Sequence, residues 1–115
     1  MDHGISLLIP PLFVGTNYAY WKVCMKVFLQ ALGEQVWQAV EIGWFKPKEA
    51  PVDWDDVTII AVNFNSRALN ALFCGVANEE FKKISSTEVA KDALTILETT
   101  YEGAKVVKTE ALKTH

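Results

Sequence analysis

Arginine and histidine are scarce in this chain of 115 residues, and the scarcity of each excludes a class of function. Arg67 is the single arginine, and the formal net charge is -3 with a pI near 5.3. A protein whose main task is nucleic-acid binding needs many cations to neutralise phosphates, and arginine is the usual bidentate phosphate ligand. The composition therefore argues against nucleic-acid binding as the main function.

Residues that could perform catalysis or hold a metal are also few. His3 and His115 lie at the ends of the chain, where chains fray, whereas a Ser-His or Cys-His pair needs a rigidly held imidazole. These histidines and two distant cysteines do not form a zinc site, and the acidic residues at 53–56 lack the spacing of an EF-hand loop. The scattered glycines form no phosphate-binding loop. We therefore expect no enzyme activity, no cofactor and no metal.

Long apolar runs are missing as well. The apolar stretch "ISLLIPPLFV" at 5–14 contains Pro10 and Pro11, and it is far shorter than the roughly 20 residues that cross a bilayer. Cys24 and Cys74 lie in apolar helical patterns, which is typical of reduced cysteines in cytosolic proteins. A disulfide that joins their two helices is the alternative. We expect a soluble, cytoplasmic domain without a membrane partner.

What the chain has in quantity is apolar residues at helical spacing. Half of its residues are hydrophobic, which is enough to bury the core of one small domain. Apolar positions three and four apart predict five helices: at 18–32, from 34 to about 42, from a cap at 53 or 55 to Gly75, at 78–84, and from the stretch at 85–88 to Gly103. A further helical pattern follows Gly103. Dipeptides typical of β-hairpins are absent. The sequence predicts an all-α fold, a small bundle of five to six mostly short helices.

Polar caps and glycines mark the ends of these helices. We expect Thr16 or Asn17 to cap the first helix and Asp53 or Asp55 to cap the third, while "SSTE" at 85–88 has the spacing of a capping box. The residues of the third helix that are predicted to face the core are Val57, Ile60, Ala61, Phe64, Ala68 and Leu72. The last helical pattern reaches the end of the chain without a cap, so we expect that helix to be cut and the natural polypeptide to be longer.

Aromatic residues in the loop that contains two prolines form a candidate interaction surface: Trp44, Phe45 and Trp54. They flank the loop and lie on no helical stripe. Two interpretations are open, namely that they cover the core or that they form an exposed contact patch.

The apolar residues before the first helix form a candidate docking arm: Ile5, Leu7, Leu8, Ile9, Leu12, Phe13 and Val14. Pro10 and Pro11 prevent an interior helix and favour an extended backbone. We predict that this arm, residues 1–15, docks in an extended form along a groove between helices. The free energy gained by burying these side chains nearly equals the entropic cost of ordering the arm. We therefore expect an exchangeable arm, which fills its own groove, fills the groove of a neighbouring copy, or gives way to a peptide.

Three groups of residues follow one another at a spacing that matches a known family. The first has the pattern F-x-G-x-N-Y-x-x-W-x-x-x-M and consists of Phe13, Gly15, Asn17, Tyr18, Trp21 and Met25. The second consists of Val36, Trp37, Val40 and Gly43. The third consists of Ala90, Lys91, Ala93, Leu97, Tyr101, Glu102, Gly103, Val107, Lys108 and Leu112. Together they resemble the start of the Gag polyprotein of plant Copia-type LTR retrotransposons, from Leu12 to the end of the chain.

Two positions and one motif depart from that family. Members often carry tryptophan and aspartate where this chain has Leu94 and Thr95, which suggests divergence, such as that of a host-adopted copy. The zinc knuckle C-x-x-C-x-x-x-x-H-x-x-x-x-C, which lies downstream in such polyproteins, is missing from this chain.

The resemblance implies one Gag-like capsid domain, with an arm at 1–15 and a helical lobe at 16–115 like the N-terminal lobe of retroviral capsids. Its expected function is structural: contact with copies of itself during the self-assembly of retrotransposon particles. The alternative is a domesticated Gag lobe that binds an apolar peptide or a host protein. Nucleic acid is expected only indirectly, through downstream regions, because the lysines of the last helix are typical of a solvated face.

Overall fold

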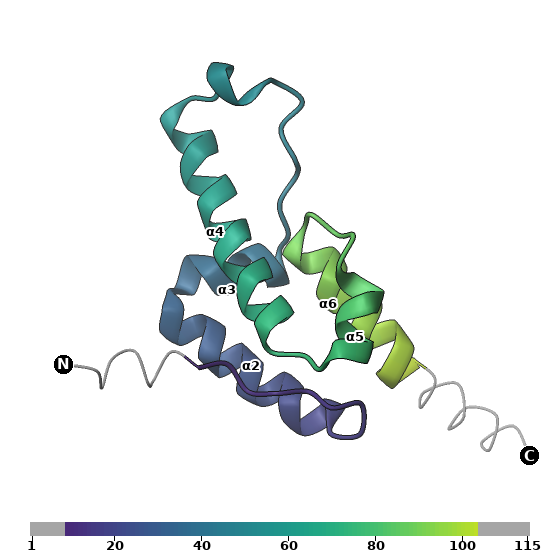
Figure 1. The fold of residues 1–115 in the computed structure, drawn as a ribbon. Helices are drawn as coiled ribbons and strands as arrows, with labels where there is room; N and C mark the ends of the chain where they lie inside the picture. The colour runs from purple at the N-terminus through teal and green to yellow at the C-terminus, as the bar shows by residue number, and fades with distance from the viewer. Residues whose placement is uncertain (1–8, 104–115) are drawn as a thin grey trace, which may run out of the picture.

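The computed structural model describes residues 9–103, and Figure 1 shows their arrangement. The α-helices in that range are α2 (Tyr18–Leu32), α3 (Glu34–Glu41), α4 (Asp56–Cys74), α5 (Asn78–Ile84) and α6 (Ala90–Glu98). A 3-10 turn lies at Pro51–Asp53, and a π-helical turn at Thr99–Gly103 continues α6. Between residues 9 and 103 there is no β-strand, only one isolated parallel bridge between Phe13 and Val76. The all-α prediction is confirmed.

The core lies where α4 packs against α3 and α6, with α2 crossing beneath (Figure 1). Side chains three and four apart on each helix meet there, as the periodicity predicts. The largest fully buried side chains are Trp21, Phe13, Met25, Leu29, Leu72, Ile84, Leu97 and Val36. The helix bounds at 18–32, 34–41 and 78–84 agree with the sequence prediction to within one residue.

The caps agree with the prediction only in part. Asp55 is the N-cap of α4, and its Oδ1 accepts a hydrogen bond of 2.8 Å from the Thr58 backbone N–H. Asn17 occupies the N-cap position of α2, but its side chain makes no bond to the helix. The predicted capping box at 85–88 is wrong, because α6 begins at Ala90 and none of its flanking side chains caps it.

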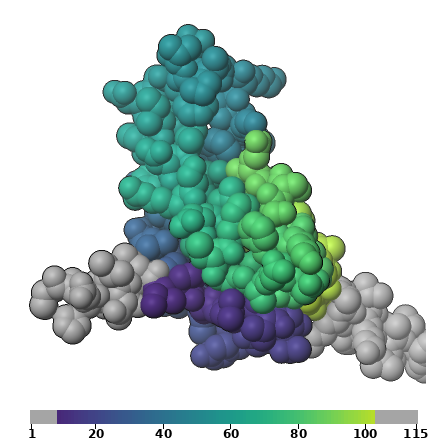
Figure 2. All heavy atoms as spheres, in the orientation of Figure 1, coloured from purple at the N-terminus to yellow at the C-terminus, as the bar shows by residue number. Residues whose placement is uncertain are grey.

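The first half of α4 projects beyond the core, which corrects the predicted inward face of this helix. Its buried side chains are Asn65, Ala68, Ala71 and Leu72, all in the second half. Val57 is 76% exposed and Ile60 is also exposed, although both continue the same stripe. No neighbouring helix reaches this far, so the start of α4 and the loop before it form a protrusion at the top of the molecule (Figures 1 and 2).

By length and hydropathy alone, α4 is the one helix within residues 9–103 that could cross a membrane. This is weak evidence, because the core helix of a soluble protein passes the same criteria. The packing of α4 against α3 and α6 accounts for the apolar composition of its second half.

Several predicted features lie outside the described residues. They are the arm residues Ile5, Leu7 and Leu8, both histidines, and the helical pattern expected after Gly103.

Candidate interaction surfaces

The arm crosses the turn between α4 and α5 in an extended form. The backbone N–H of Phe13 donates to the carbonyl oxygen of Gly75 at 2.8 Å, and the N–H of Ala77 donates to the carbonyl oxygen of Phe13 at 2.8 Å. The Phe13 side chain is fully buried. The indole Nε1–H of Trp21 donates to the carbonyl oxygen of Pro11 at 3.0 Å, so α2 also holds the arm.

Asn17 clamps the arm from the start of α2. Its Oδ1 accepts from the backbone N–H of Val14 at 3.1 Å, and its Nδ2 donates to the carbonyl oxygen of Leu12 at 3.2 Å. These two bonds replace the helix cap that the sequence predicts at this position. The arm is thereby fixed in direction just before the helix begins.

Two glycines make room for this path. A Cβ on Gly75 would lie 2.9 Å from the carbonyl oxygen of Pro11 and would collide with the Met25 methyl group. Gly15 has a φ of 91°, a conformation that favours glycine, and a Cβ there would lie 3.0 Å from Glu80 Oε2. The role of seating the arm is therefore shared by Phe13, Gly15, Asn17, Trp21 and Met25.

An aromatic cluster surrounds the buried end of the arm. The Phe13 ring lies 5.4 Å from Tyr18, 5.3 Å from Trp21 and 4.7 Å from Tyr101, measured between ring centroids. The Tyr18 hydroxyl is buried and has no hydrogen-bond partner among the described residues. Burial raises the pKa of Tyr18, and the negative charges of Glu98 and Glu102 raise it further.

The rim of this cluster carries the charges. The Tyr101 hydroxyl donates to Glu80 Oε2 at 3.2 Å and accepts from Lys83 Nζ at 2.6 Å. The Lys22 ammonium of α2 bonds to Glu98 of α6, its strongest partner, and this hydrogen bond raises the pKa of Lys22. These contacts join α2 and α5 to the end of α6.

The other apolar residues of the described arm remain in contact with solvent. Ile9, Leu12 and Val14 are each more than half exposed, so burial in residues 9–14 is concentrated in Phe13. In residues 9–14 the extended backbone lies against the α4–α5 turn, and Phe13 is the one large apolar side chain of this stretch that is buried.

The structure separates the three loop aromatics. Phe45 is 96% exposed. Trp44 is half-buried beside a shallow hollow whose far wall is formed by Ala61 and Phe64 of α4. Trp54 is half-buried, and its indole Nε1–H donates to the carbonyl oxygen of Glu49 at 3.0 Å, which ties the loop to itself. Of the three, Phe45 alone offers most of its side chain to a partner.

A second exposed apolar surface lies at the end of the protrusion. Its members come from the 3-10 turn and the first turns of α4, and we call Val52, Val57 and Ile60 the tip surface. Val52 is 88% exposed. Four carboxylates belong to the same segment: Glu49, Asp53, Asp55 and Asp56.

A third exposed apolar surface runs along α2, on the side away from the core. We call Tyr20, Val23 and Val27 the α2 outer face. Tyr20 is 72% exposed, and the other two are more than half exposed. This face was not predicted from the sequence, because the larger side chains of α2 form the stripe on its other side. The signal was present, since α2 has apolar residues on both of its sides and only two charged residues.

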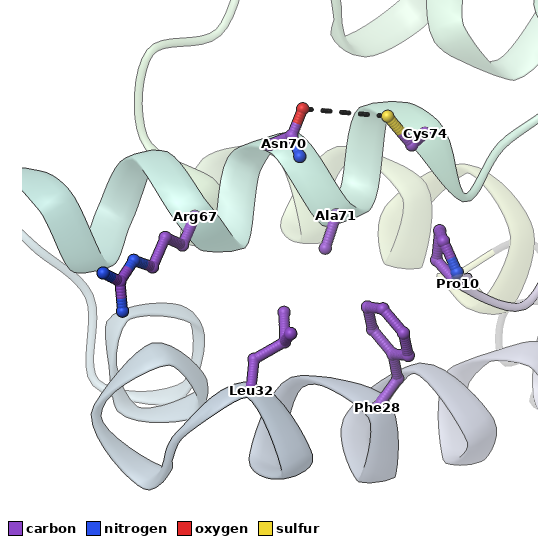
Figure 3. A pocket seen from close by; sticks show the side chains of 7 residues that line it. All are labelled: Pro10, Phe28, Leu32, Arg67, Asn70, Ala71 and Cys74. Carbon is purple, nitrogen blue, oxygen red and sulfur yellow. Dashed lines mark hydrogen bonds between the residues drawn. The ribbon is translucent and has the colours of Figure 1, made fainter. Parts of the chain in front are cut away.

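A cleft of about 390 Å³ separates α2 from α4 (Figure 3). Phe28 and Leu32 of α2 form one wall, and α4 forms the other. Pro10 of the arm lies at one end and Arg67 at the opposite end (Figure 3). The lining is therefore mostly apolar, with one guanidinium group.

Residues 9–103 contain no group of three or more His, Cys, Asp or Glu side chains that could hold a metal ion. Both cysteines are free: Cys24 is half-buried on α2, and Cys74 is exposed at the end of α4.

Residues 15–41, which comprise α2 and α3, match the family model described as a domain of unknown function (DUF4219). No curated protein matches the chain, and no solved structure matches it.

Proposed function

We propose that this chain is a Gag-like capsid domain that contributes to the self-assembly of retrotransposon particles through protein–protein contacts. The resemblance of its three residue groups to Copia-type Gag supports this proposal. The match at residues 15–41 is to a domain typical of plant retrotransposon Gag-like proteins, and it adds support.

The observation that carries the proposal is the number of large apolar side chains that remain exposed to water. The tip surface and the α2 outer face each group apolar side chains that are exposed and have no partner among residues 9–103. Grouped exposed apolar residues mark interaction sites in soluble proteins, whereas scattered ones do not. Contacts of this size are weak singly and become effective when many copies repeat them.

Assembly of this kind needs no catalysis, cofactor or metal, and the proposed function includes none. We place it in the cytoplasm, where Cys24 and Cys74 would stay reduced. Nucleic acid would enter the particle through other regions of the polyprotein.

The test is the mass of the 115-residue chain in solution as its concentration rises from micromolar to millimolar. We expect the average mass measured by light scattering to increase steadily and reversibly. A chain that remains strictly monomeric at millimolar concentration would contradict the proposal.

The cleft between α2 and α4 favours a second candidate function, that of a peptide-binding module. Its apolar walls and single guanidinium group suit an extended apolar peptide that carries a carboxylate near Arg67. Saturable one-to-one binding of such a peptide by a monomeric chain, lost on Arg67→Ala and retained on Lys91→Ala, would support this alternative.

A further inference from the structure

The tip surface and the α2 outer face lie at opposite ends of the molecule. The start of α4 and the loop before it are at the top of Figure 1, and α2 is at the bottom. Tyr18, Trp21, Met25 and Leu29 of α2 are buried and point toward the core, so the α2 outer face points away from it. The two surfaces therefore cannot cover each other within one chain.

The two surfaces also differ in charge. Residues 48–60, which carry the tip surface, contain Glu49, Asp53, Asp55 and Asp56 against one lysine. Helix α2 contains Lys22 and Lys26 and no acidic residue. Lys26 is exposed beside the α2 outer face, with its Nζ 5.4 Å from the Trp37 ring centroid.

Three pairings of these surfaces between two copies are possible, and charge discriminates between them. A contact of two tips would bring eight carboxylates together, four from each copy. Lys22 is paired with Glu98, so a contact of two α2 outer faces would bring the two Lys26 ammonium groups together. A contact of a tip with an α2 outer face would set carboxylates beside Lys26. Charge complementarity selects partners and orientation, while the apolar side chains supply most of the affinity.

We propose that the tip surface of one copy docks on the α2 outer face of a second copy. Val52 and Val57 of one copy would contact Val23 and Val27 of the other. The contact is heterologous, so in a pair one copy keeps its α2 outer face free and the other keeps its tip surface free. The contact can therefore repeat to form a ring or an open chain. This inference rests on the proposed self-association and names the surfaces that perform it.

Two variants test the pairing because each would lose one surface. The tip variant carries Val52→Ser and Val57→Ser, and the face variant carries Val23→Ser and Val27→Ser. All four side chains are more than half exposed, so both variants should fold, which circular dichroism checks. We expect each variant alone to be monomeric at concentrations where the unaltered chain associates. An equimolar mixture should form a heterodimer that grows no further, because one intact tip meets one intact α2 outer face.

The outcomes separate this inference from the proposed function. If the unaltered chain never associates, both are wrong. If it associates but the mixture forms no heterodimer, or one variant still forms dimers with itself, the heterologous pairing is wrong and self-association stands. Phe45→Ser is the matched control, since Phe45 is exposed outside both surfaces. It should associate as the unaltered chain does, and its loss of association would also overturn the pairing.

A charge exchange gives an independent readout. We expect Lys26→Glu and Asp53→Lys each to weaken association by roughly twofold to fivefold, the range of exposed ion pairs. The chain that carries both changes should recover most of the loss, because the two charges then face each other with reversed sign. Additive losses in the double variant would contradict the proposed contact.

Discussion

At the scale of single residues, Asn65 is the polar side chain on which two helices depend. It is buried on α4, and its Oδ1 accepts from the backbone N–H of Ala90 at 2.9 Å, which is the first residue of α6. Its Nδ2 donates to the carbonyl oxygen of Glu88 at 2.8 Å. Asn65 thus caps α6 from another helix, and both its side-chain Oδ1 and its Nδ2 are hydrogen-bonded.

Asn65→Ala should lower the free energy of unfolding by about 2–4 kcal/mol, because it leaves a buried N–H and a carbonyl group without partners. Asn63→Ala on the exposed side of the same helix is the control and should change it by about 0.5 kcal/mol or less. Urea denaturation measures both. Equal losses would mean that the amide does not cap α6.

Tyr18 gives the opposite expectation. Its hydroxyl is buried without a partner among the described residues, so Tyr18→Phe removes a desolvated group and keeps the ring. We predict that this variant is as stable as the parent or more stable by about 1 kcal/mol. Tyr20→Phe, on the exposed face, is the matched change. A clear loss of stability in Tyr18→Phe alone would reveal a bonded hydroxyl.

Asp55 makes the folding stability of the chain depend on pH in the acidic range. The Thr58 hydroxyl and backbone N–H lower the pKa of Asp55, since both favour its charged form. Because the pKa is lowered, the cap contributes its full stability at pH values above the ordinary aspartate pKa of about 3.9. This contribution is lost as the pH falls through the lower pKa of the folded state. Asp55→Asn should keep the cap without titrating. Its melting temperature should lie below that of the parent at neutral pH, because the neutral amide lacks the favoured charge, and it should fall less in acid. Parallel curves would contradict this.

At the scale of elements, the arm and the α4–α5 turn act as one unit. Phe13→Ala should cost about 3–5 kcal/mol of stability, because it empties the centre of the aromatic cluster. Leu12→Ala, next to it and exposed, should cost about 0.5 kcal/mol or less. Denaturation of the two variants decides, and similar values would mean that the arm is not seated through Phe13.

Gly75→Ala tests the same unit from the other side. The new methyl group would press on the Pro11 carbonyl oxygen and on Met25, so we expect a loss of about 1–3 kcal/mol from overpacking. Hydrogen exchange at the Phe13 amide should accelerate more than exchange in α3. Unchanged protection at Phe13 would show that the arm does not rely on this close approach.

The helices were predictable from the sequence because their periodicity is local, but their caps and partners were not. The bond from Ala90 to Asn65 joins residues 25 positions apart, so no local pattern such as 85–88 reveals it. Periodicity places Val57 and Phe64 on one side of α4, but it does not tell where the neighbouring helices end. Among the site residues, the exposure of Phe45 is one of the two alternatives that the sequence left open.

At the scale of the whole molecule, association through the tip surface and the α2 outer face should respond to salt. Added sodium chloride screens the carboxylates and lysines but not the apolar contact, so we expect the dissociation constant to rise modestly and then level off. Light scattering at several salt concentrations measures this. An association that strengthens with sodium chloride from the start would mean that like charges meet in the contact.

The seat of the arm also has a consequence for synthesis. More than half of the chain's length separates Phe13 from Gly75, which receives it, and the Glu98 partner of Lys22 comes later still. A ribosome that adds about 5–20 residues per second makes Gly75 roughly 3–12 seconds after Phe13. During that interval Phe13 can meet Tyr18 and Trp21, and α2 can meet α3, but the α4–α5 turn and Tyr101, which complete the seat, are not yet made. The incomplete chain therefore exposes apolar surface that the finished fold buries around Phe13.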